Sequence, residues 1–362
     1  MKRFEIVDFL KGYSIFATMT FHYCRHLHLS NPLEGIVSFG GTGIHLFIVL
    51  SGFGLYYSYI RKPLPYLSFL KKRVSKVYAP YIFVVLFSAL LSIFLPVYDN
   101  SWYALGGHIF LYKMFDESII GSYGYPLWFI SMILQFYFTF HLIVWFKSKF
   151  KLKDKTFLLT SFLISIGWAT VVFLMNKEGE RIWNSFFLQY FWEFALGMVI
   201  AGKIFRNEKL LKKSTHQPFL LTMGLILCAI CGFLGMKGGD VGKLFNDFFA
   251  LTGSAFLATF LYNLKIKPLN QLFLFVGKIS TAVYLLHILV ILTITNLFDN
   301  LSPILIVLFA SIAVIPVSLV YQKMINRYHT VRAKQKVKKR EKSNKFKMEE
   351  KKKKKILDLQ LR

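Results

Sequence analysis

Apolar runs long enough to cross a bilayer recur along the whole chain, separated by short polar segments. This alternation predicts about ten transmembrane helices and places the protein in the all-α class, as a polytopic membrane protein. The first span lacks a small-residue cleavage site, so we expect it to be retained and not removed as a signal peptide. The spans are expected near residues 8–27, 39–60, 78–97, 127–146, 157–175, 184–202, 218–236, 245–263, 272–296 and 302–322.

The overall composition agrees with the pattern of runs. Hydrophobic residues make up 55% of the 362 positions and aromatic residues 18%, which is too apolar for a soluble protein of this length. The composition therefore excludes an ordinary soluble enzyme.

The distribution of basic residues predicts the orientation of the spans. Of the 45 Lys and Arg residues, 37 fall on one side of the ten-span arrangement and six on the other, while Lys11 and Lys278 lie inside spans. Because cytoplasmic loops carry the excess of Lys and Arg, both termini are predicted to be cytoplasmic. We expect a multi-pass protein of the cytoplasmic membrane.

The C-terminal segment has a composition of its own. Residues 323–362 carry 17 Lys and Arg residues against four acidic ones, with a run at Lys351–Lys355. Such tails are typical of disordered segments that bind anionic lipids. Its aromatic residues, Tyr328 and Phe346, are too few for the interleaving with basic residues that nucleic-acid binding would favour. We therefore divide the chain into a membrane domain, residues 1–325, and a disordered basic tail, residues 326–362, with no nucleic-acid partner.

Two ionisable residues share one face of the first span. Lys11 and His22 are eleven residues apart, so a helix brings them to about 20° from alignment and about 16.5 Å apart along its axis. Asp8 lies one turn before Lys11. Ionisable groups inside a membrane span are functional candidates by default. A snorkelling lysine and a structural histidine are the alternative, and the spacing leaves both interpretations open.

The cysteines give little evidence of chemistry. Cys228 and Cys231 form a C-x-x-C pair inside an apolar span, and Cys24 is alone. Because no second Cys or His pair accompanies them at metal-binding spacing, we predict buried small residues and no metal site.

Several motifs along the chain resemble, in order and spacing, those of the acyltransferase-3 family of integral membrane acyltransferases. The resemblance covers about residues 4–325. The motifs are Asp8-Phe9-Leu10-Lys11-Gly12 with His22; the Gly-rich entry Gly40–Gly43 leading to Phe47-Ile48-Val49-Leu50-Ser51-Gly52-Phe53; the basic segment Phe69–Lys76 followed by Pro80-Tyr81; Leu127-Trp128-Phe129-Ile130 with Gln135 and Tyr137; Phe194–Met198; and Ser280 with Tyr284-Leu285-Leu286-His287.

The resemblance implies transfer of an acyl group, usually acetyl, from cytoplasmic acetyl-CoA to a carbohydrate hydroxyl. The acceptor would be a cell-surface or lipid-linked glycan, and the enzyme an O-acetyltransferase with acyl-CoA as a substrate and no permanently bound cofactor. A sugar hydroxyl needs a base to take its proton, and His22 is the candidate. Asp8 would pair with Lys11 and hold it in place.

The basic segment and the second span would bind the donor. Lys72, Arg73 and Lys76 are expected at the cytoplasmic mouth of the third span, where they would bind CoA phosphates, although a basic cytoplasmic loop also needs no ligand. Ser51 and Gly52 allow close approach, either of the substrate arm or of a neighbouring helix. Lys11 and Lys76 stand where the family usually has Arg, so the charge is kept and the bidentate geometry is lost.

Four more residues are candidates without an assigned role: His45, Trp128, Glu193 and His287. A glycan exporter or flippase is the alternative function, because buried charges would line a transport pathway equally well. No inverted repeat of broken helices is visible to favour a transporter.

Overall fold

The computed structural model describes residues 4–27, 29, 37, 39–208 and 216–360, and this part of the chain contains helices and no strand. Short helices connect the long ones: α5 (Trp102–Phe110), α8 (Arg181–Asn184) and α11 (Gly239–Leu244). The long helices are α1 (Glu5–Cys24), α3 (Gly43–Arg61), α4 (Tyr66–Phe94), α6 (Trp128–Lys149), α7 (Asp154–Leu174), α9 (Phe191–Phe205), α10 (Gln217–Lys237), α12 (Asp247–Asn263), α13 (Lys267–Lys278), α14 (Ser280–Leu297) and α15 (Pro303–Gln360).

The all-α membrane class is confirmed. Every predicted span overlaps at least one helix, and seven helical segments in the described residues are long and apolar enough to cross a bilayer. These segments belong to α3, α4, α6, α7, α10, α14 and the first part of α15. With 15 and 17 residues, α9 and α12 are shorter than a full span. The count of ten and the side of the termini stay predictions.

Two predicted boundaries are wrong. The expected span 272–296 consists of two helices, because α13 ends at the exposed Lys278 and α14 begins at Ser280; a cation in the last turn is favourable at a helix C-terminus. The third span was expected from residue 78, whereas α4 begins at Tyr66. Pro65 presets the backbone before this helix, and the Leu, Lys and Arg residues that follow are good helix formers. The predicted basic loop is therefore the first turns of α4.

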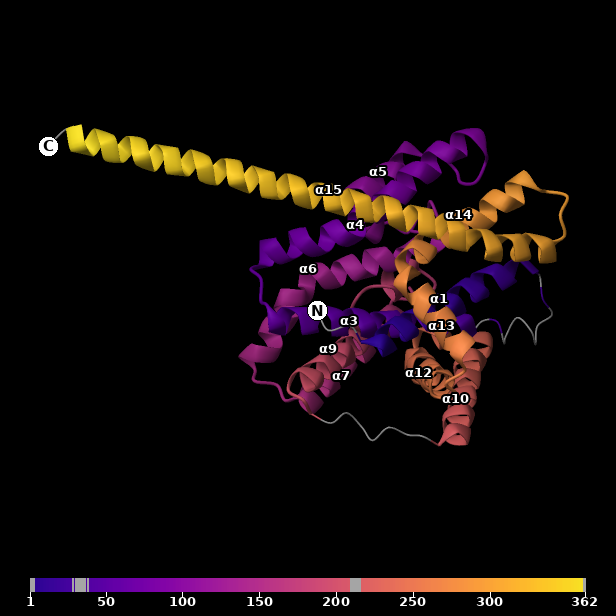
Figure 1. Cartoon of the computed structure of the whole chain (residues 1–362). Helices are drawn as coiled ribbons and strands as arrows, with labels where there is room; N and C mark the ends of the chain where they lie inside the picture. The colour runs from indigo at the N-terminus through magenta and orange to yellow at the C-terminus, as the bar shows by residue number, and fades with distance from the viewer. Residues whose placement is uncertain (1–3, 28, 30–36, 38, 209–215, 361–362) are drawn as a thin grey trace. The chain divides into compact units, whose positions relative to one another are not determined.

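Glycines hold two helix pairs at close range. A Cβ built on Gly52 would lie 2.1 Å from the carbonyl oxygen of Phe194, and one on Gly197 would lie 2.0 Å from that of Val49. These contacts join α3 to α9, which also packs on α7 (Figure 1). Gly12 brings α1 onto α13 in the same way, with its built Cβ 1.9 Å from the carbonyl oxygen of Phe273. Small residues at such crossings are typical of membrane helices.

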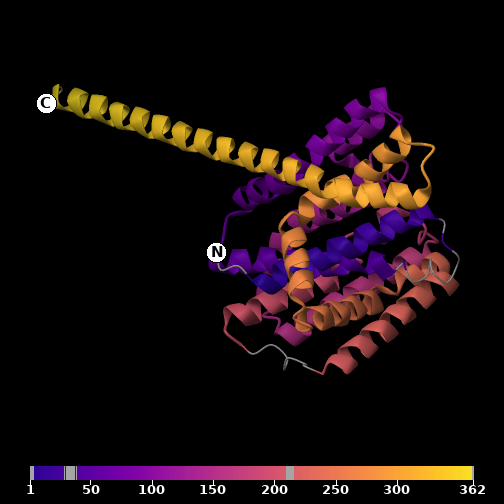
Figure 2. The ribbon, with the colours of Figure 1, turned by 45° about the vertical axis from the view of Figure 1, so that its right-hand side comes forward.

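The chain divides into two compact units, Met1–Ile315 and Pro316–Arg362. Within the first unit, α10 lies beside α12 (Figure 2), where Cys228 and Cys231 are buried and free. In the second unit the helical backbone of α15 continues to Gln360, where the sequence predicts disorder. Lys, Glu and Gln are good helix formers, which accounts for the helix. The side chains of the predicted lipid-binding run Lys351–Lys355 lie outside the described part.

Candidate active site

A cavity of about 360 Å³ lies between α1, α3, α4, α6 and α14. We call it the first cavity. Three of the sequence candidates line it: Lys11 from α1, Ser51 from α3 and Arg73 from α4. The remaining lining residues are Phe47, Leu50, Gly54, Leu55, Val77, Phe129, Ile130, Ile133, Tyr137, Ser280, Thr281 and Tyr284.

The charges of the first cavity all have one sign. Lys11 and Arg73 are its charged residues, and none of the described residues that line it is a carboxylate. Apolar side chains form most of the remaining wall, so the attraction for an anionic group is weakly screened. The cavity is suited to a ligand that carries negative charge at one end and an apolar arm.

The other sequence candidates for donor binding lie elsewhere. Lys72 and Lys76 are exposed on α4 and do not line the first cavity. Gly52 lies against the backbone of α9 instead. The geometry thus favours the packing alternative for Gly52, while Ser51 and Gly54 face the cavity. Asp8 lies on α1 one turn before Lys11, and its pairing with Lys11 stays a prediction.

Two histidines meet beside the first cavity. The rings of His22 and His287 are 5.3 Å apart, and His287 is 6.0 Å from the ring of Tyr284, which lines the cavity. The Nδ1 of His287 lies 2.8 Å from the carbonyl oxygen of Tyr284 and 3.2 Å from that of Val283. Carbonyl oxygens only accept, so Nδ1 carries the proton and Nε2 carries a lone pair.

The lone pair of His287 has no partner among the described residues. His287 is fully buried and its Nε2 is without a hydrogen bond there. Tyr23, the neighbour of His22, donates its hydroxyl to the carbonyl oxygen of His287 at 3.0 Å, which fixes α1 against α14. The structure therefore brings two imidazoles together next to the cavity that contains Lys11 and Arg73.

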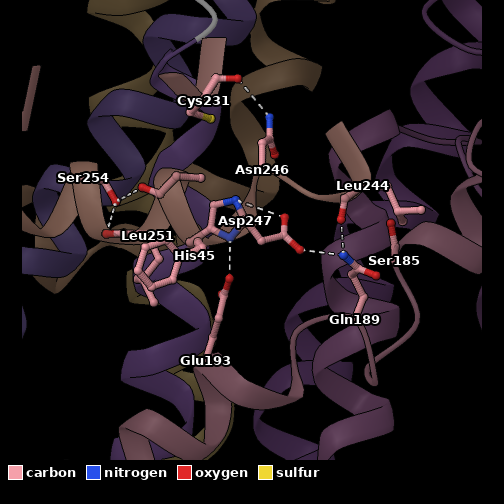
Figure 3. A network of polar contacts seen from close by, with 12 residues as sticks. His45, Ser185, Gln189, Glu193, Cys231, Leu244, Asn246, Asp247, Leu251 and Ser254 are labelled. Atoms are coloured by element: carbon pink, nitrogen blue, oxygen red, sulfur yellow. Dashed lines mark hydrogen bonds and ion pairs between the residues drawn. The ribbon is translucent and has the colours of Figure 1, made fainter. Parts of the chain in front are cut away.

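A second buried polar cluster surrounds His45 (Figure 3). Its Nδ1 lies 2.7 Å from Oε1 of Glu193, and its Nε2 lies 3.9 Å from Oδ1 of Asp247. Gln189 donates from Nε2 to Asp247 and to the carbonyl oxygen of Leu244, both at 2.7 Å. The cluster joins α3, α9 and α12 and accounts for two sequence candidates, His45 and Glu193. A buried carboxylate needs such partners to offset its desolvation.

Trp128 belongs to an aromatic and cationic stack. Its ring lies 6.2 Å from that of Tyr190 in a stacked arrangement, and the Arg181 guanidinium is 5.0 Å from the ring centroids of both Trp128 and Tyr125. Glu117 holds the start of α8 in place, because its carboxylate accepts hydrogen bonds from the backbone N–H groups of residues 181 and 182. Tyr190 also contacts His45, so the stack continues into the His45 cluster.

The sequence of the chain matches a known family over most of its length. The model of the acyltransferase-3 family, described as an acyltransferase domain, matches residues 4–323. The chain belongs to this family. It is a membrane acyltransferase, and the family match extends over all the residues of the first cavity and of the His45 cluster. No curated protein and no solved structure matches the chain.

Three residues of this acyltransferase escaped the sequence analysis. Asp247 and Gln189 complete the His45 cluster, and Arg181 forms the stack with Trp128. Asp247 gave a usable signal, because a carboxylate inside the predicted span 245–263 is costly unless it is paired. Gln189 and Arg181 gave none, because polar residues near the end of a span are ordinary.

Proposed function

We propose that this acyltransferase moves an acetyl group from cytoplasmic acetyl-CoA to a hydroxyl of a cell-surface or lipid-linked carbohydrate. The observation that carries the proposal is the first cavity, in which Lys11 and Arg73 lie among apolar residues next to His22 and His287. Coenzyme A matches this arrangement, because its phosphates are anionic and its arm is thin and neutral.

Arg73 is the residue that binds phosphate in this proposal. Its guanidinium can donate two parallel hydrogen bonds to phosphate oxygens. Lys72 and Lys76, exposed on the same helix, add charge near the entrance. Lys11 lines the same cavity from α1 and would interact with the polar groups of the donor arm, while Ser51 and Gly54 leave room for the arm.

Acyl transfer then requires a base at the thioester. The acceptor hydroxyl oxygen attacks the thioester carbonyl carbon, the hydroxyl proton passes to the imidazole of His22, and the bond to sulfur breaks to release the CoA thiolate, which takes up a proton. His287 accompanies His22 as a second neutral imidazole. The reaction needs no permanently bound cofactor, and the protein works as a multi-pass enzyme of the cytoplasmic membrane.

Binding of acetyl-CoA to purified protein in detergent tests the proposal. Replacing Arg73 with Ala removes hydrogen bonds to a charged group, each worth about 1.5–3 kcal/mol, so we expect the Kd to rise about tenfold or more. Lys71→Ala is the matched control, because Lys71 is an exposed cation on the same turn that does not line the cavity. Isothermal titration calorimetry measures both.

The exporter alternative predicts a different result. A wild-type protein that binds no acetyl-CoA, while cells without it accumulate glycan on the inner side of the membrane, would contradict the acyltransfer proposal and favour export.

A further inference from the structure

A second cavity, of about 540 Å³, lies apart from the first. Its lining residues include Arg25, Tyr125, Glu178, Arg181, Gln189 and Asp247. Arg25 lies at the end of the first predicted span. The other lining residues lie in, or close to, loops that the sequence places on the outer side of the membrane. The first cavity, by contrast, contains Arg73 from the opposite, cytoplasmic side.

Three buried polar atoms of the second cavity have no partner in the described part of the chain. They are Oε2 of Glu178, Nε of Arg181 and Oε1 of Gln189. All three residues line this cavity. A buried polar atom without a hydrogen bond costs about 1–3 kcal/mol, and most such atoms in native proteins are satisfied. Two acceptors and one donor that gather on one cavity indicate a ligand that both donates and accepts, as hydroxyl groups do.

The charges of the second cavity balance. Three cations, Arg25, Arg181 and Lys243, face three carboxylates, those of Glu178, Asp240 and Asp247. Lys243 and Asp240 already form an ion pair at 2.9 Å. A phosphate or carboxylate ligand would meet carboxylates as well as cations, so the balance favours an uncharged ligand.

Aromatic rings complete the surroundings. Tyr125 and Tyr190 line the cavity, and the Arg181 guanidinium stacks on Tyr125. Ring faces beside a few polar groups are typical of small-molecule sites, and the C–H face of a sugar ring packs on such surfaces.

We propose that the second cavity binds the acceptor, as an uncharged sugar residue whose hydroxyls meet Glu178, Arg181 and Gln189. This proposal rests on the proposed function, because only an acyltransferase of this kind has a carbohydrate acceptor. It adds where the acceptor binds and that the bound sugar is uncharged. Along α1 and the turn after it, Lys11 lines the first cavity and Arg25 lines the second, with His22 one turn before Arg25. The base therefore lies between the residues that bind donor and acceptor.

Saturation-transfer NMR on the full chain tests this, because it detects millimolar binding. The protein is kept in lauryldimethylamine oxide, since detergents with sugar headgroups would compete for the cavity. The probes are the methyl glycosides of glucose, galactose, mannose and N-acetylglucosamine, with glucuronic acid and glucose 6-phosphate as anionic comparators. We expect at least one neutral glycoside to bind saturably and more tightly than both anions.

A pair of matched variants tests whether the glycoside binds in the second cavity. Glu178→Ala should raise the Kd of that glycoside about tenfold or more, as expected for losing a hydrogen bond to a charged group. Glu180→Ala, on the same loop, removes only a surface ion pair with Lys177 and should leave the Kd unchanged. Unfolding temperatures of both variants check that they fold.

The outcomes separate the two proposals. The cavity proposal is overturned if no neutral glycoside binds, if an anionic probe binds more tightly, or if both variants bind like the wild type. If a glycoside binds and responds to Glu178→Ala while acetyl-CoA does not bind to the same preparation, the site stands and the donor half of the proposed function fails.

Discussion

The two cavities differ most in the charges that line them. Lys11 and Arg73 give the first cavity positive charge with no carboxylate among its described lining residues, whereas the second holds three cations and three carboxylates. An unbalanced cavity selects for an anion and a balanced one selects against any charged ligand. The first cavity therefore suits the proposed acyl donor, and the second suits the proposed uncharged acceptor.

A single helix relates the two sites. Lys11, near the start of α1, lines the first cavity, and Arg25, directly after α1 ends, lines the second. The His22 and His287 rings meet between these positions. If the first cavity binds the donor, the second binds the acceptor and His22 is the base, then changes at His22 should lower the rate of acyl transfer and leave both binding sites intact.

The largest expected effect is therefore that of His22→Ala. Loss of a general base lowers rates by about 10²–10⁴-fold, so acyl transfer should fall by that factor. Acetyl-CoA binding and glycoside binding should both persist in the same preparation, because His22 lines neither cavity. Transfer is measured as acetylated glycan by mass spectrometry. Cys24→Ala, two residues further on the same helix, is the control. Near-wild-type transfer by a well-expressed His22→Ala protein would exclude His22 as the base.

A smaller effect, on stability, is expected at the contact that positions both sites. The α3 helix contributes Ser51 to the first cavity and His45 to the cluster that joins the second, and Gly197 holds it against α9. In Gly197→Ala the new Cβ would lie 2.0 Å from the carbonyl oxygen of Val49. Such overpacking lowers stability by about 1–3 kcal/mol.

Unfolding temperature in detergent measures this cost. Gly167→Ala on α7 is the matched control, because nothing lies within 4 Å of a Cβ built there, and Ala is a better helix former than Gly. Equal unfolding temperatures for the two variants would show that the α3–α9 contact is less close than described.

The helices were largely accessible from the sequence, and the first cavity only in part. Apolar runs and the periodicity of Lys11 and His22 predict the helices and one shared face, since both depend on local sequence. Motif order gave the family, and Lys11, Ser51 and Arg73 do line one cavity. The start of α4 was missed because charged residues that would be typical of a loop are also good helix formers.

The second cavity could not be predicted, for a physical reason. Its residues come from separate segments of the chain, and apart from Asp247 its polar residues are ordinary in their own segments. Only the packing of α7, α9 and α12 brings Glu178, Gln189 and Asp247 to the same place. What identifies the site is the absence of partners for buried atoms in the described part, and that property belongs to the folded chain.

The comparison of the cavities also makes a prediction about a cation that lines neither. Lys113, in the short turn Tyr112–Phe115 between α5 and α6, is fully buried, and its Nζ has no hydrogen-bond partner among the described residues. Burial lowers its pKa from 10.5 to about 7. If the cations that line the cavities serve to bind ligands, Lys113, which lines neither, should not be needed for activity and should lower the stability of the folded protein.

Lys113→Met should therefore stabilise the protein near neutral pH and change the pH dependence of its stability. Between about pH 7 and pH 10.5 the unfolded state of the wild type holds one more proton at Lys113 than the folded state, so wild-type stability rises with pH. The slope is at most about 1.4 kcal/mol per pH unit; Lys113 adds no pH dependence below about pH 7, where both states are protonated, or above about pH 10.5, where both are deprotonated. Unfolding temperatures measured from pH 7 to pH 10 should thus be higher and flatter for Lys113→Met than for the wild type, with the gap closing as pH rises. Lys177→Met, at a surface lysine paired with Glu180, should follow the wild-type profile. Parallel profiles for wild type and Lys113→Met would mean that the amino group is charged and satisfied when folded, and that buried cations in this chain need no ligand to be retained.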